Sequence, residues 1–175
     1  MDWLIVTYRL GSGGSSARVA VWREVRRSGA LQLQQSVVAF PDHEAFSRAV
    51  DRLRALVSEV GGETLAVRAE PLAAADGARL VDAWNEARGA EYTELVSECE
   101  KFLAEIDHEF EIEKFTLAEL DEEESALERL QTWHERIAAR DLHGASGSAE
   151  ALAALGRAQQ ALDRYSAAVF ERTAP

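Results

Sequence analysis

The N-terminal part of the chain alternates between two hydrophobic periods. Short apolar or period-two runs rich in β-branched residues indicate strands, and longer segments with apolar residues every three or four positions indicate helices. The predicted strands lie at residues 3–8, 31–34, 36–40 and 63–69, and the predicted helices at residues 15–28 and 42–60. Gly29 and the pair Gly61–Gly62 end these helices. The element order predicts a ferredoxin-like βαββαβ domain over residues 1–71.

A sheet of this kind has two faces with different surroundings. Both predicted helices cover one face. The other face is then solvated, covered by the second half of the chain, or paired with a second subunit. Periodicity alone leaves these three alternatives open. Gln35–Ser36, which joins the two middle strands, is an atypical pair for a tight hairpin turn.

The remainder of the chain, residues 72–175, has helical spacing throughout. Helices are predicted at residues 78–88, 91–113 and 116–140, and a last helix follows a loop at residues 144–148. Thr116 and Glu119 form a capping box at the start of the third helix. The apolar stripes consist of Leu95, Cys99, Phe102, Ile106 and Phe110, and of Leu152, Leu155, Leu162, Tyr165 and Val169. Their seven-residue spacings predict antiparallel helical packing, so the chain as a whole belongs to the α+β class.

Charge distinguishes the two halves. The formal net charge of −12 argues against a general nucleic-acid-binding protein, because a phosphate backbone favours lysine and arginine. Residues 1–71 contain nine arginines and eight acidic residues, a net charge of about +1. Residues 72–175 contain ten basic and twenty-three acidic residues, a net charge of about −13. The acidic excess therefore belongs to the second half.

Four arginines gather on the first predicted helix: Arg18, Arg23, Arg26 and Arg27. The last three are neighbours at three- and four-residue spacing, and only Glu24 offsets their charge locally. Such a helix face is suited to contacts with DNA phosphates. A face that pairs with the acidic second half, within the chain or between subunits, has the same pattern, and charge alone does not separate these interpretations.

A glycine–serine loop at residues 11–16 precedes that helix. Backbone N–H groups between a strand and a helix N-terminus bind anions, and Arg9 and Arg18 flank the loop with two guanidinium groups. Arg9, Ser15, Ser16 and Arg18 are therefore candidate oxyanion ligands. A flexible turn with a helix cap explains the same residues without any ligand. The loop lacks the Gly-Lys-Ser/Thr of nucleotide-binding P-loops.

Other chemistry has little support. Glu105-x-x-His108 has the spacing of di-iron bundles, but a second copy of the motif is missing and His108 is expected to point away from the apolar stripe. The histidines surround no nucleophilic serine elbow. Cys99 is the only cysteine, which excludes an internal disulfide. We therefore expect neither an enzyme nor a cofactor.

The composition also indicates where the protein acts. No apolar run approaches the ~20 residues of a membrane span, and the N-terminus does not have the pattern of a signal peptide. A single cysteine is compatible with a reducing compartment. We expect a cytoplasmic protein without a membrane partner.

Several separated segments carry a resemblance to a known family. Residues 15–34 (SSARVAVWREVRRSGALQLQ) and 37–42 (VVAFPD) resemble the N-terminal region of ChrB, the chromate-resistance regulatory protein. Glu91-Tyr92, residues 110–115 and Arg140-Asp141-Leu142 are also similar to that family. The resemblance covers nearly the whole chain. It implies a chromate-sensitive transcriptional regulator that binds the operator DNA of chromate-resistance genes.

Two departures from the family pattern affect which family properties are expected of this chain. Longer ChrB proteins have a further C-terminal domain, which this chain lacks because it ends at Pro175. If that domain senses chromate, this chain is expected to bind DNA or a partner without sensing it. Relatives also have a proline-containing loop where this sequence has glycines, so Ser15, Ser16 and Arg18 are stronger candidates than those glycines.

The N-terminal half additionally resembles the ferredoxin-like unit of the CRISPR spacer-acquisition subunit and of PaaX-type regulators. In the CRISPR proteins an aspartate near the end of the first strand is linked to nuclease activity, whereas Thr7-Tyr8-Arg9 offers no carboxylate there. The resemblance disfavours a metal-dependent nuclease and implies a homodimer formed through the sheet.

The leading hypothesis is a dimeric ChrB-like regulator that contacts DNA through its four helical arginines and is modulated by an oxyanion or a partner protein. The alternative is an interaction module that does not bind DNA and whose acidic helical half engages a basic partner. An enzyme acting on a small anion is the weakest hypothesis, because no general base lies near the loop in sequence.

Overall fold

The computed structural model describes residues 1–11 and 15–173. The chain divides into two compact units, Met1–Trp84 and Asn85–Pro175, which are described separately below. One long helix, α3 (Ala74–Glu111), begins in the first unit and ends in the second. The prediction of a mixed α+β chain is confirmed, since the first unit contains a four-stranded antiparallel sheet and the second is helical.

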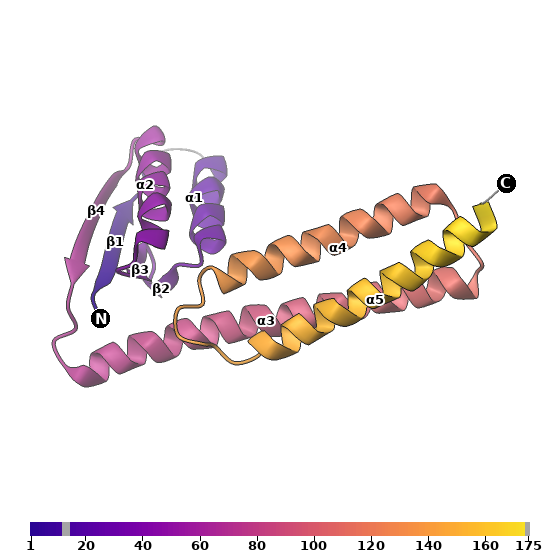
Figure 1. Ribbon diagram of the computed structural model, residues 1–175. Helices are drawn as coiled ribbons and strands as arrows, with labels where there is room; N and C mark the ends of the chain where they lie inside the picture. Colours follow the sequence, from indigo (N-terminus) through magenta and orange to yellow (C-terminus); the bar gives the residue numbers. More distant parts are fainter. Residues whose placement is uncertain (12–14, 174–175) are drawn as a thin grey trace. The chain divides into compact units, whose positions relative to one another are not determined.

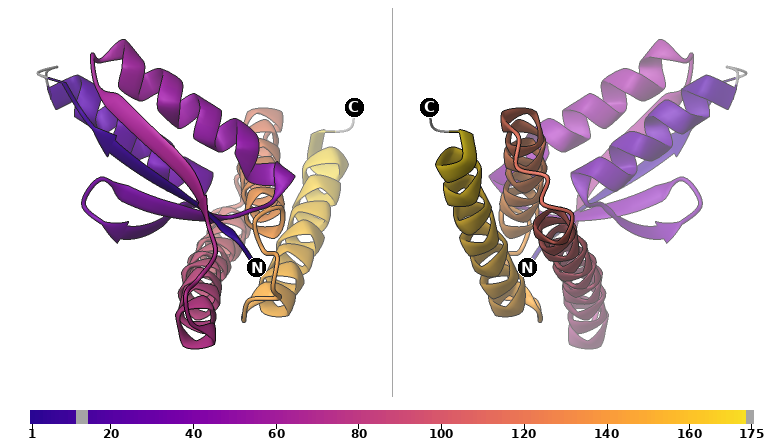
Figure 2. Two further views of the ribbon diagram at one scale, coloured as in Figure 1. Left: turned by 90° about the vertical axis from the view of Figure 1, so that its left-hand side faces the viewer. Right: turned by 90° about the vertical axis from the view of Figure 1, so that its right-hand side faces the viewer.

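The N-terminal unit contains four strands and two helices besides the start of α3 (Figure 1). They are β1 (Trp3–Arg9), α1 (Ser15–Ser28), β2 (Leu31–Gln34), β3 (Val37–Pro41), α2 (Glu44–Glu59) and β4 (Glu63–Ala69). The strands pair in the order β2-β3-β1-β4, and every neighbouring pair is antiparallel. Helices α1 and α2 lie beside each other on one side of this sheet (Figures 1 and 2).

The strand register assigns the side chains to two faces, because successive residues of a strand point to opposite sides. Val6 pairs with Val38, and together with Phe40 these residues are completely buried beneath the helices. The opposite face also carries apolar side chains, but those at the edges are exposed: Leu65 is 61 % and Val67 is 44 % accessible. Trp3 and Ala39 belong to the same face and are buried, so this second face is apolar and only partly covered.

Two turns in this unit depend on unusual backbone conformations. Ser36, between β2 and β3, has φ +66°, and its carbonyl accepts a hydrogen bond from the Tyr8 N–H at 3.0 Å. The atypical Gln35–Ser36 pair does form the predicted hairpin, with an irregularity in β2 between Gln32 and Gln34. Gly29, with φ +70°, follows α1 at the position where the sequence predicts a glycine stop.

The first turns of α3 complete the core of the N-terminal unit. Trp84 is completely buried, and its ring contacts the edges of Trp3 and Phe46, with ring centroids 6.1 Å and 5.2 Å apart. A residue after the sheet in sequence thereby packs against both the first strand and the second helix. Offset and edge-to-face aromatic contacts of this kind stabilise a core beyond the area that they bury.

The C-terminal unit is an antiparallel bundle of the rest of α3 with α4 (Leu117–Ala138) and α5 (Ser148–Thr173) (Figure 1). The prediction of separate helices at residues 78–88 and 91–113 is wrong, because α3 continues through Gly89. A Cβ at Gly89 would lie 2.9 Å from the Ser146 hydroxyl oxygen. The glycine therefore allows the α4–α5 loop to approach the helix closely, and it does not end the helix.

The bundle core largely follows the predicted stripes. Leu95, Cys99 and Ile106 of α3 are completely buried, and the Thr116 hydroxyl accepts the Glu119 N–H at 3.2 Å, as the capping box predicts. Leu152 is wrongly predicted to be part of the stripe of α5 and is 61 % exposed. The other four predicted residues, Leu155, Leu162, Tyr165 and Val169, are buried, and small residues complete the seam of α5: Ala151, Ala154, Ala158, Ala161 and Ala168.

Candidate nucleic-acid interface

Helix α1 has a narrow buried side and a broad exposed side. Val21 and Val25 are 1 % and 4 % exposed and form the apolar contact with the rest of the unit. Glu24 is also buried on this side, at 7 % exposure. The opposite side is left to solvent, and three of the four predicted arginines lie there.

We call this exposed surface the Arg–Trp face and define it by Arg18, Trp22, Arg23 and Arg26. At 100° per residue these four positions span an arc of about 140°. All four are exposed, and the Arg26 guanidinium lies over the Trp22 ring, 5.6 Å from its centroid. Within the described residues, Arg18 and Arg23 form no ion pair. The face therefore presents cations and one large aromatic surface together.

Trp22 is a residue that the sequence analysis missed. Its ring is 55 % exposed, although tryptophan is usually largely buried. Trp22 lies four residues from both Arg18 and Arg26, so the sequence does place it on the same side of the helix as these arginines. This spacing was the feature from which its position could have been predicted. An exposed tryptophan beside arginines is typical of interfaces, where both residue types carry a large share of binding energy.

Arg27 differs from the other three arginines. Its Nε donates to the Glu24 carboxylate at 3.0 Å, and its terminal nitrogen contacts the same oxygen. The other Glu24 oxygen lies 3.9 Å from the Arg52 Nε on α2. Arg27 and Arg52 thus together neutralise the buried Glu24 carboxylate. The Arg27 guanidinium is therefore less available for an external anion than the other three.

The residues of the predicted oxyanion site have mixed surroundings. Arg9 pairs with Glu63 directly across β1 and β4, at 2.9 Å, with both side chains exposed. Ser15 and Ser16 are exposed in the first turn of α1, and residues 12–14 of the loop lie outside the described residues. A Cβ at Gly11 would lie 2.5 Å from the Val60 carbonyl oxygen, so this glycine is required by the close approach of two backbones.

The C-terminal unit contains a buried charged network at the end of the bundle near the α4–α5 loop. Glu91 accepts from the Arg88 Nε at 2.9 Å and from an Arg140 terminal nitrogen at 2.5 Å. Burial lowers the pKa of Arg88, and the nearby Glu91 carboxylate opposes that effect. Beside this network, the Tyr92 hydroxyl donates to Asp141 Oδ2 at 3.3 Å. The other carboxylate oxygen, Asp141 Oδ1, accepts a hydrogen bond from the Ala145 N–H.

A second cluster, near the α3–α4 connection, is acidic. Glu109 and Glu123 are 2 % and 5 % exposed, and the Lys114 Nζ lies 3.7 Å from Glu109 and 2.5 Å from Glu119. The Tyr165 hydroxyl donates to the Lys114 carbonyl at 2.5 Å. Burial, followed by the surrounding carboxylates, raises the pKa of Glu123. Lys114 therefore pairs with Glu109 and Glu119, and neither of these contacts includes Glu123.

This cluster predicts a pH dependence of stability. Because the pKa of Glu123 in the folded state is raised above its ordinary value of 4.5, the folded protein holds this proton more tightly than the unfolded chain does. The resulting stabilisation is complete below that ordinary value and is lost as the pH rises through the raised pKa. Glu123→Gln is expected to remove this decline and to stabilise the protein at pH 7, as measured by denaturant unfolding between pH 4 and pH 8.

The matched control is Glu124→Gln, which removes the same charge from the adjacent exposed position. We expect its stability to follow the wild-type dependence on pH. Equal effects of the two substitutions would show that the buried position of Glu123 does not influence folding.

The described residues contain neither a metal-binding cluster nor a membrane-spanning helix. No group of three or more histidine, cysteine, aspartate or glutamate side chains there is placed to hold a metal ion. The side chain of His108 is 56 % exposed, which confirms that it points outward. Within the same residues, no helix combines the length and apolar character needed to cross a membrane.

Fold and surface together define a mixed α+β protein with an arginine-rich helix beside an antiparallel sheet and an acidic helical unit. Residues 18–175 match the family described as Protein ChrB, N-terminal. The chain therefore belongs to the ChrB N-terminal family, as its resemblance predicts, and is related to chromate resistance. The matched residues include the whole Arg–Trp face but not Arg9, Ser15 or Ser16. No curated protein matches the chain.

Proposed function

We propose that the protein is a transcriptional regulator of chromate-resistance genes that contacts operator DNA through Arg18, Arg23, Arg26 and Arg27. The observation that carries this proposal is the Arg–Trp face, because its arginines lie on one exposed side of a rigid helix. Family membership supplies the link to chromate resistance. The proposed role is regulatory and not enzymatic.

The four arginines are expected to contribute unequally. Arg18, Arg23 and Arg26 would meet phosphates directly, whereas Arg27 would have to share its charge with Glu24. Trp22 would add an apolar contact with sugars or bases next to these charges. Contacts of this kind determine affinity and its salt dependence, while sequence choice requires base contacts or DNA deformation.

A triple variant of the Arg–Trp face tests this proposal. Replacing Arg18, Arg23 and Arg26 by alanine is expected to weaken binding to DNA from upstream of the gene at least tenfold at low salt. The slope of log K against log salt is negative, and each lost phosphate contact reduces its magnitude by about 0.9, so the slope should become less steep by about 2 to 3. Fluorescence anisotropy at several salt concentrations measures both quantities.

A matched triple variant provides the control. Arg129, Arg136 and Arg164 are exposed arginines of the C-terminal unit, and their replacement by alanine changes the net charge equally. This variant should retain the affinity and the salt slope. If both triple variants behave like the wild type, the DNA-binding proposal is wrong; if both lose affinity equally, only general charge matters.

We further propose that an oxyanion such as chromate binds at the start of α1, where Arg9, Ser15, Ser16 and Arg18 lie in neighbouring segments. The free N–H groups of a helix N-terminus favour anions. Glu63 competes for Arg9 in the structure and would have to release it. Chromate-dependent release of DNA in the same anisotropy experiment, lost in Arg18→Ala, would support this site, and indifference to chromate would reject it.

The N-terminal unit is proposed to be of the ferredoxin-like type and to form a homodimer through the exposed part of its second sheet face. The exposed apolar side chains on this face, Leu65 and Val67, support the dimer because monomers rarely expose adjacent apolar residues without function. Leu65→Lys is expected to shift sedimentation from dimer to monomer. Leu72→Lys, at a fully exposed position outside the strands, is the control that should leave the mass unchanged.

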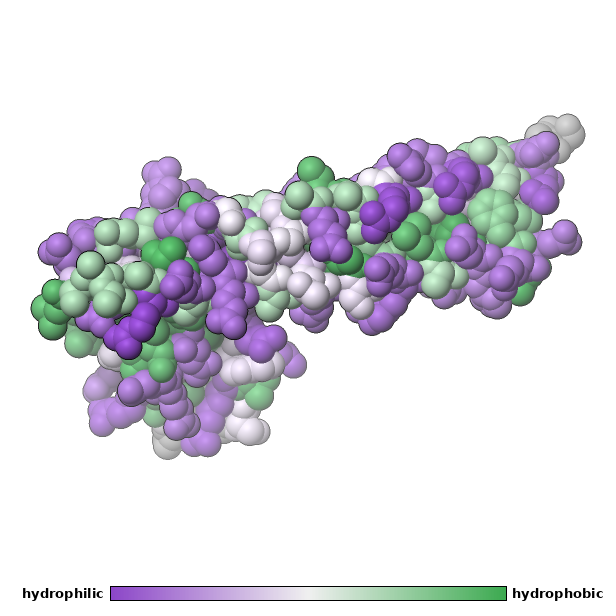
Figure 3. Space-filling view, turned by 90° about the horizontal axis from the view of Figure 1, so that it is seen from below, coloured by the Kyte–Doolittle hydropathy of each residue, from purple (hydrophilic) through white to green (hydrophobic). Residues whose placement is uncertain are grey.

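A second candidate function is a protein-interaction module that does not bind DNA. It is favoured by apolar side chains exposed among the acidic residues of the C-terminal unit, namely Ile112, Leu117 and Phe170, each at least 50 % accessible. Figure 3 shows apolar surface interrupting the polar surface of this unit. A basic, partly apolar protein segment would fit such a surface. Absence of DNA binding at low salt would make this function the better supported one.

A further inference from the structure

Helices α4 and α5 each carry a stripe of residues outside the bundle core. On α4 the stripe repeats at four- and three-residue intervals and consists of Leu117, Asp121, Glu124, Glu128, Gln131 and Glu135. On α5 the same intervals give Leu152, Gly156, Gln159, Asp163, Ser166 and Phe170. The α4 stripe is exposed throughout, and the α5 residues are exposed or partly exposed. Such spacing keeps residues on one side of a helix, as in coiled coils.

One hydrogen bond shows that the two stripes lie side by side. The Gln131 side-chain nitrogen on α4 donates to the Gln159 side-chain oxygen on α5 at 3.1 Å. Because the two helices are antiparallel (Figure 1), Leu117 and Phe170 lie near one end of the paired stripes and Leu152 lies near the other. Leu152 and Phe170 are about 27 Å apart along α5. We call the paired stripes the α4–α5 face.

Both ends of the α4–α5 face are apolar. Leu117 and Phe170 are 52 % and 58 % accessible at one end, and Leu152 is 61 % accessible at the other. Gly156 lies one turn after Leu152, and a Cβ there would have no neighbouring atom within 4 Å, so the α5 backbone is open to a partner. Large apolar side chains that share one polar surface are typical of interaction sites.

Between its apolar ends the face is acidic. It carries no lysine or arginine and has five carboxylates, those of Asp121, Glu124, Glu128, Glu135 and Asp163. The ion pairs that the described residues of the C-terminal unit form involve other carboxylates. The negative charge of the face is therefore available to a cationic partner.

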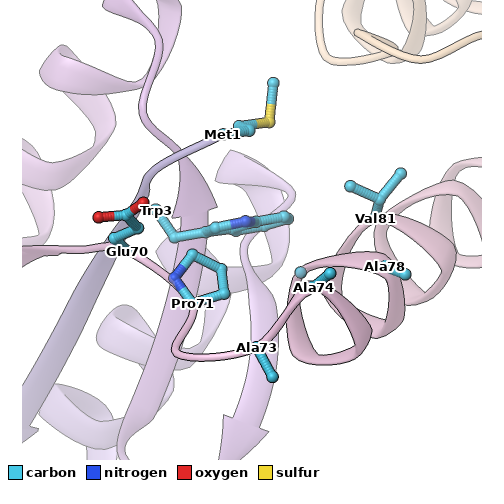
Figure 4. A pocket seen from close by; sticks show the side chains of 9 residues that line it. Met1, Trp3, Glu70, Pro71, Ala73, Ala74, Ala78 and Val81 are labelled. Atoms are coloured by element: carbon cyan, nitrogen blue, oxygen red, sulfur yellow. The ribbon is translucent and has the colours of Figure 1, made fainter.

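The hollow in the N-terminal unit differs in charge. Its volume is about 390 Å³, it lies beside Trp3, and Glu70 is the one charged residue of its lining (Figure 4). A basic segment is therefore attracted to the α4–α5 face more strongly than to this hollow.

We propose that the α4–α5 face binds a basic amphipathic helix of a partner protein. A helix of about 20 residues spans the face, and it would place apolar residues near both ends and lysine or arginine between them. The inference rests on the second candidate function, whose site and partner it specifies, and it does not depend on DNA binding.

The probe for this site is a fluorescein-labelled, alanine-based helical peptide of about 20 residues with leucines near both ends and lysines at heptad spacing between them. The matched probe has glutamates in place of the lysines. Fluorescence anisotropy with the full chain is expected to show saturable binding of the basic peptide below about 100 μM at low salt, and at least about tenfold weaker binding of the acidic peptide. Absence of saturable binding of the basic peptide would overturn the inference.

Alanine substitutions test whether both apolar ends take part. Phe170→Ala should weaken binding of the basic peptide about tenfold, and Leu152→Ala at least about threefold. Ile112→Ala removes an exposed apolar side chain that belongs to neither stripe, and it should leave the affinity unchanged. An equal loss in Ile112→Ala, or a loss in Phe170→Ala without one in Leu152→Ala, would overturn this site but retain the second candidate function.

A double substitution tests the acidic part of the face. Glu124→Gln combined with Glu128→Gln should weaken binding of the basic peptide about fivefold, as expected for two exposed charge contacts. The matched double variant combines Glu94→Gln with Glu100→Gln, which removes the same charge from exposed positions of α3 and should change the affinity less than about twofold. Equal losses in the two double variants would show that only general charge attracts the peptide and would overturn the inference.

Discussion

Replacing Glu91 by alanine is expected to lower the free energy of unfolding of the C-terminal unit by about 3 kcal/mol. Glu91 is the shared partner of two arginines, Arg88 of α3 at 2.8 Å and Arg140 of the turn after α4 at 2.5 Å. The Arg88 side chain is only 3 % exposed and would remain a buried cation with less compensation. Glu91 itself is partly exposed, which places the loss near the lower end of the ~3–5 kcal/mol typical for a broken buried pair.

Two further variants separate charge from packing. Glu91→Gln keeps the shape of the side chain but removes its charge. If the charge matters, this variant should lower the free energy of unfolding almost as much as Glu91→Ala does. Glu94→Ala, an exposed glutamate on the same helix, should change stability by less than about 0.5 kcal/mol. Hydrogen exchange of bundle amides measures the three variants, and similar values for Glu91→Ala and Glu94→Ala would contradict the stabilising role of the network.

The second large effect concerns the N-terminal core. Trp84→Ala is expected to lower the free energy of unfolding of this unit by about 3–5 kcal/mol, as for other buried aromatic truncations. The ring is completely buried against Trp3 and Phe46, so its removal leaves a cavity between α3, β1 and α2. Hydrogen exchange of amides in β1 and β3 resolves this unit from the helical bundle.

Trp22→Ala is the matched control, because it removes the same side chain from an exposed helix position. Its effect on stability should remain below about 1 kcal/mol, although it removes part of the Arg–Trp face. Under the DNA-binding proposal the two variants differ in what they change. Trp22→Ala lowers the affinity for DNA, whereas Trp84→Ala lowers the free energy of unfolding of the N-terminal unit. A stability loss in Trp84→Ala no larger than in Trp22→Ala would contradict the proposed core.

Local features of the chain were predictable because they depend on neighbours in sequence. Hydrophobic period identified the strands and helices of the N-terminal unit, Gly29 marked the end of α1, and the Thr116 capping box marked the start of α4. The failures also have a physical explanation. A glycine such as Gly89 usually indicates the end of a helix. Here it lies inside α3, and the close approach of Ser146, which leaves no room for a Cβ, explains why the residue is glycine.

The composition of α5 shows the same limit. Periodicity favoured Leu152 as a core residue because leucine is large and apolar, but helices that pack closely bury small residues. The seam of α5 therefore combines alanines with Leu155, Leu162, Tyr165 and Val169, while Leu152 lies in solvent. The candidate site was partly predictable: the arginines of α1 were evident, whereas the exposure of Trp22 required knowing which side of the helix is covered.

The family, the order of most elements and the arginine-rich character of α1 follow from the amino-acid sequence alone, because motifs, periods and charges are properties of contiguous residues. Which of those residues come into contact depends on the folded chain. Glu24 lies near Arg52 of α2, Glu91 binds Arg140, and Trp3 packs on Trp84. These contacts join positions far apart in the chain, and the packing of the folded backbone alone brings them together.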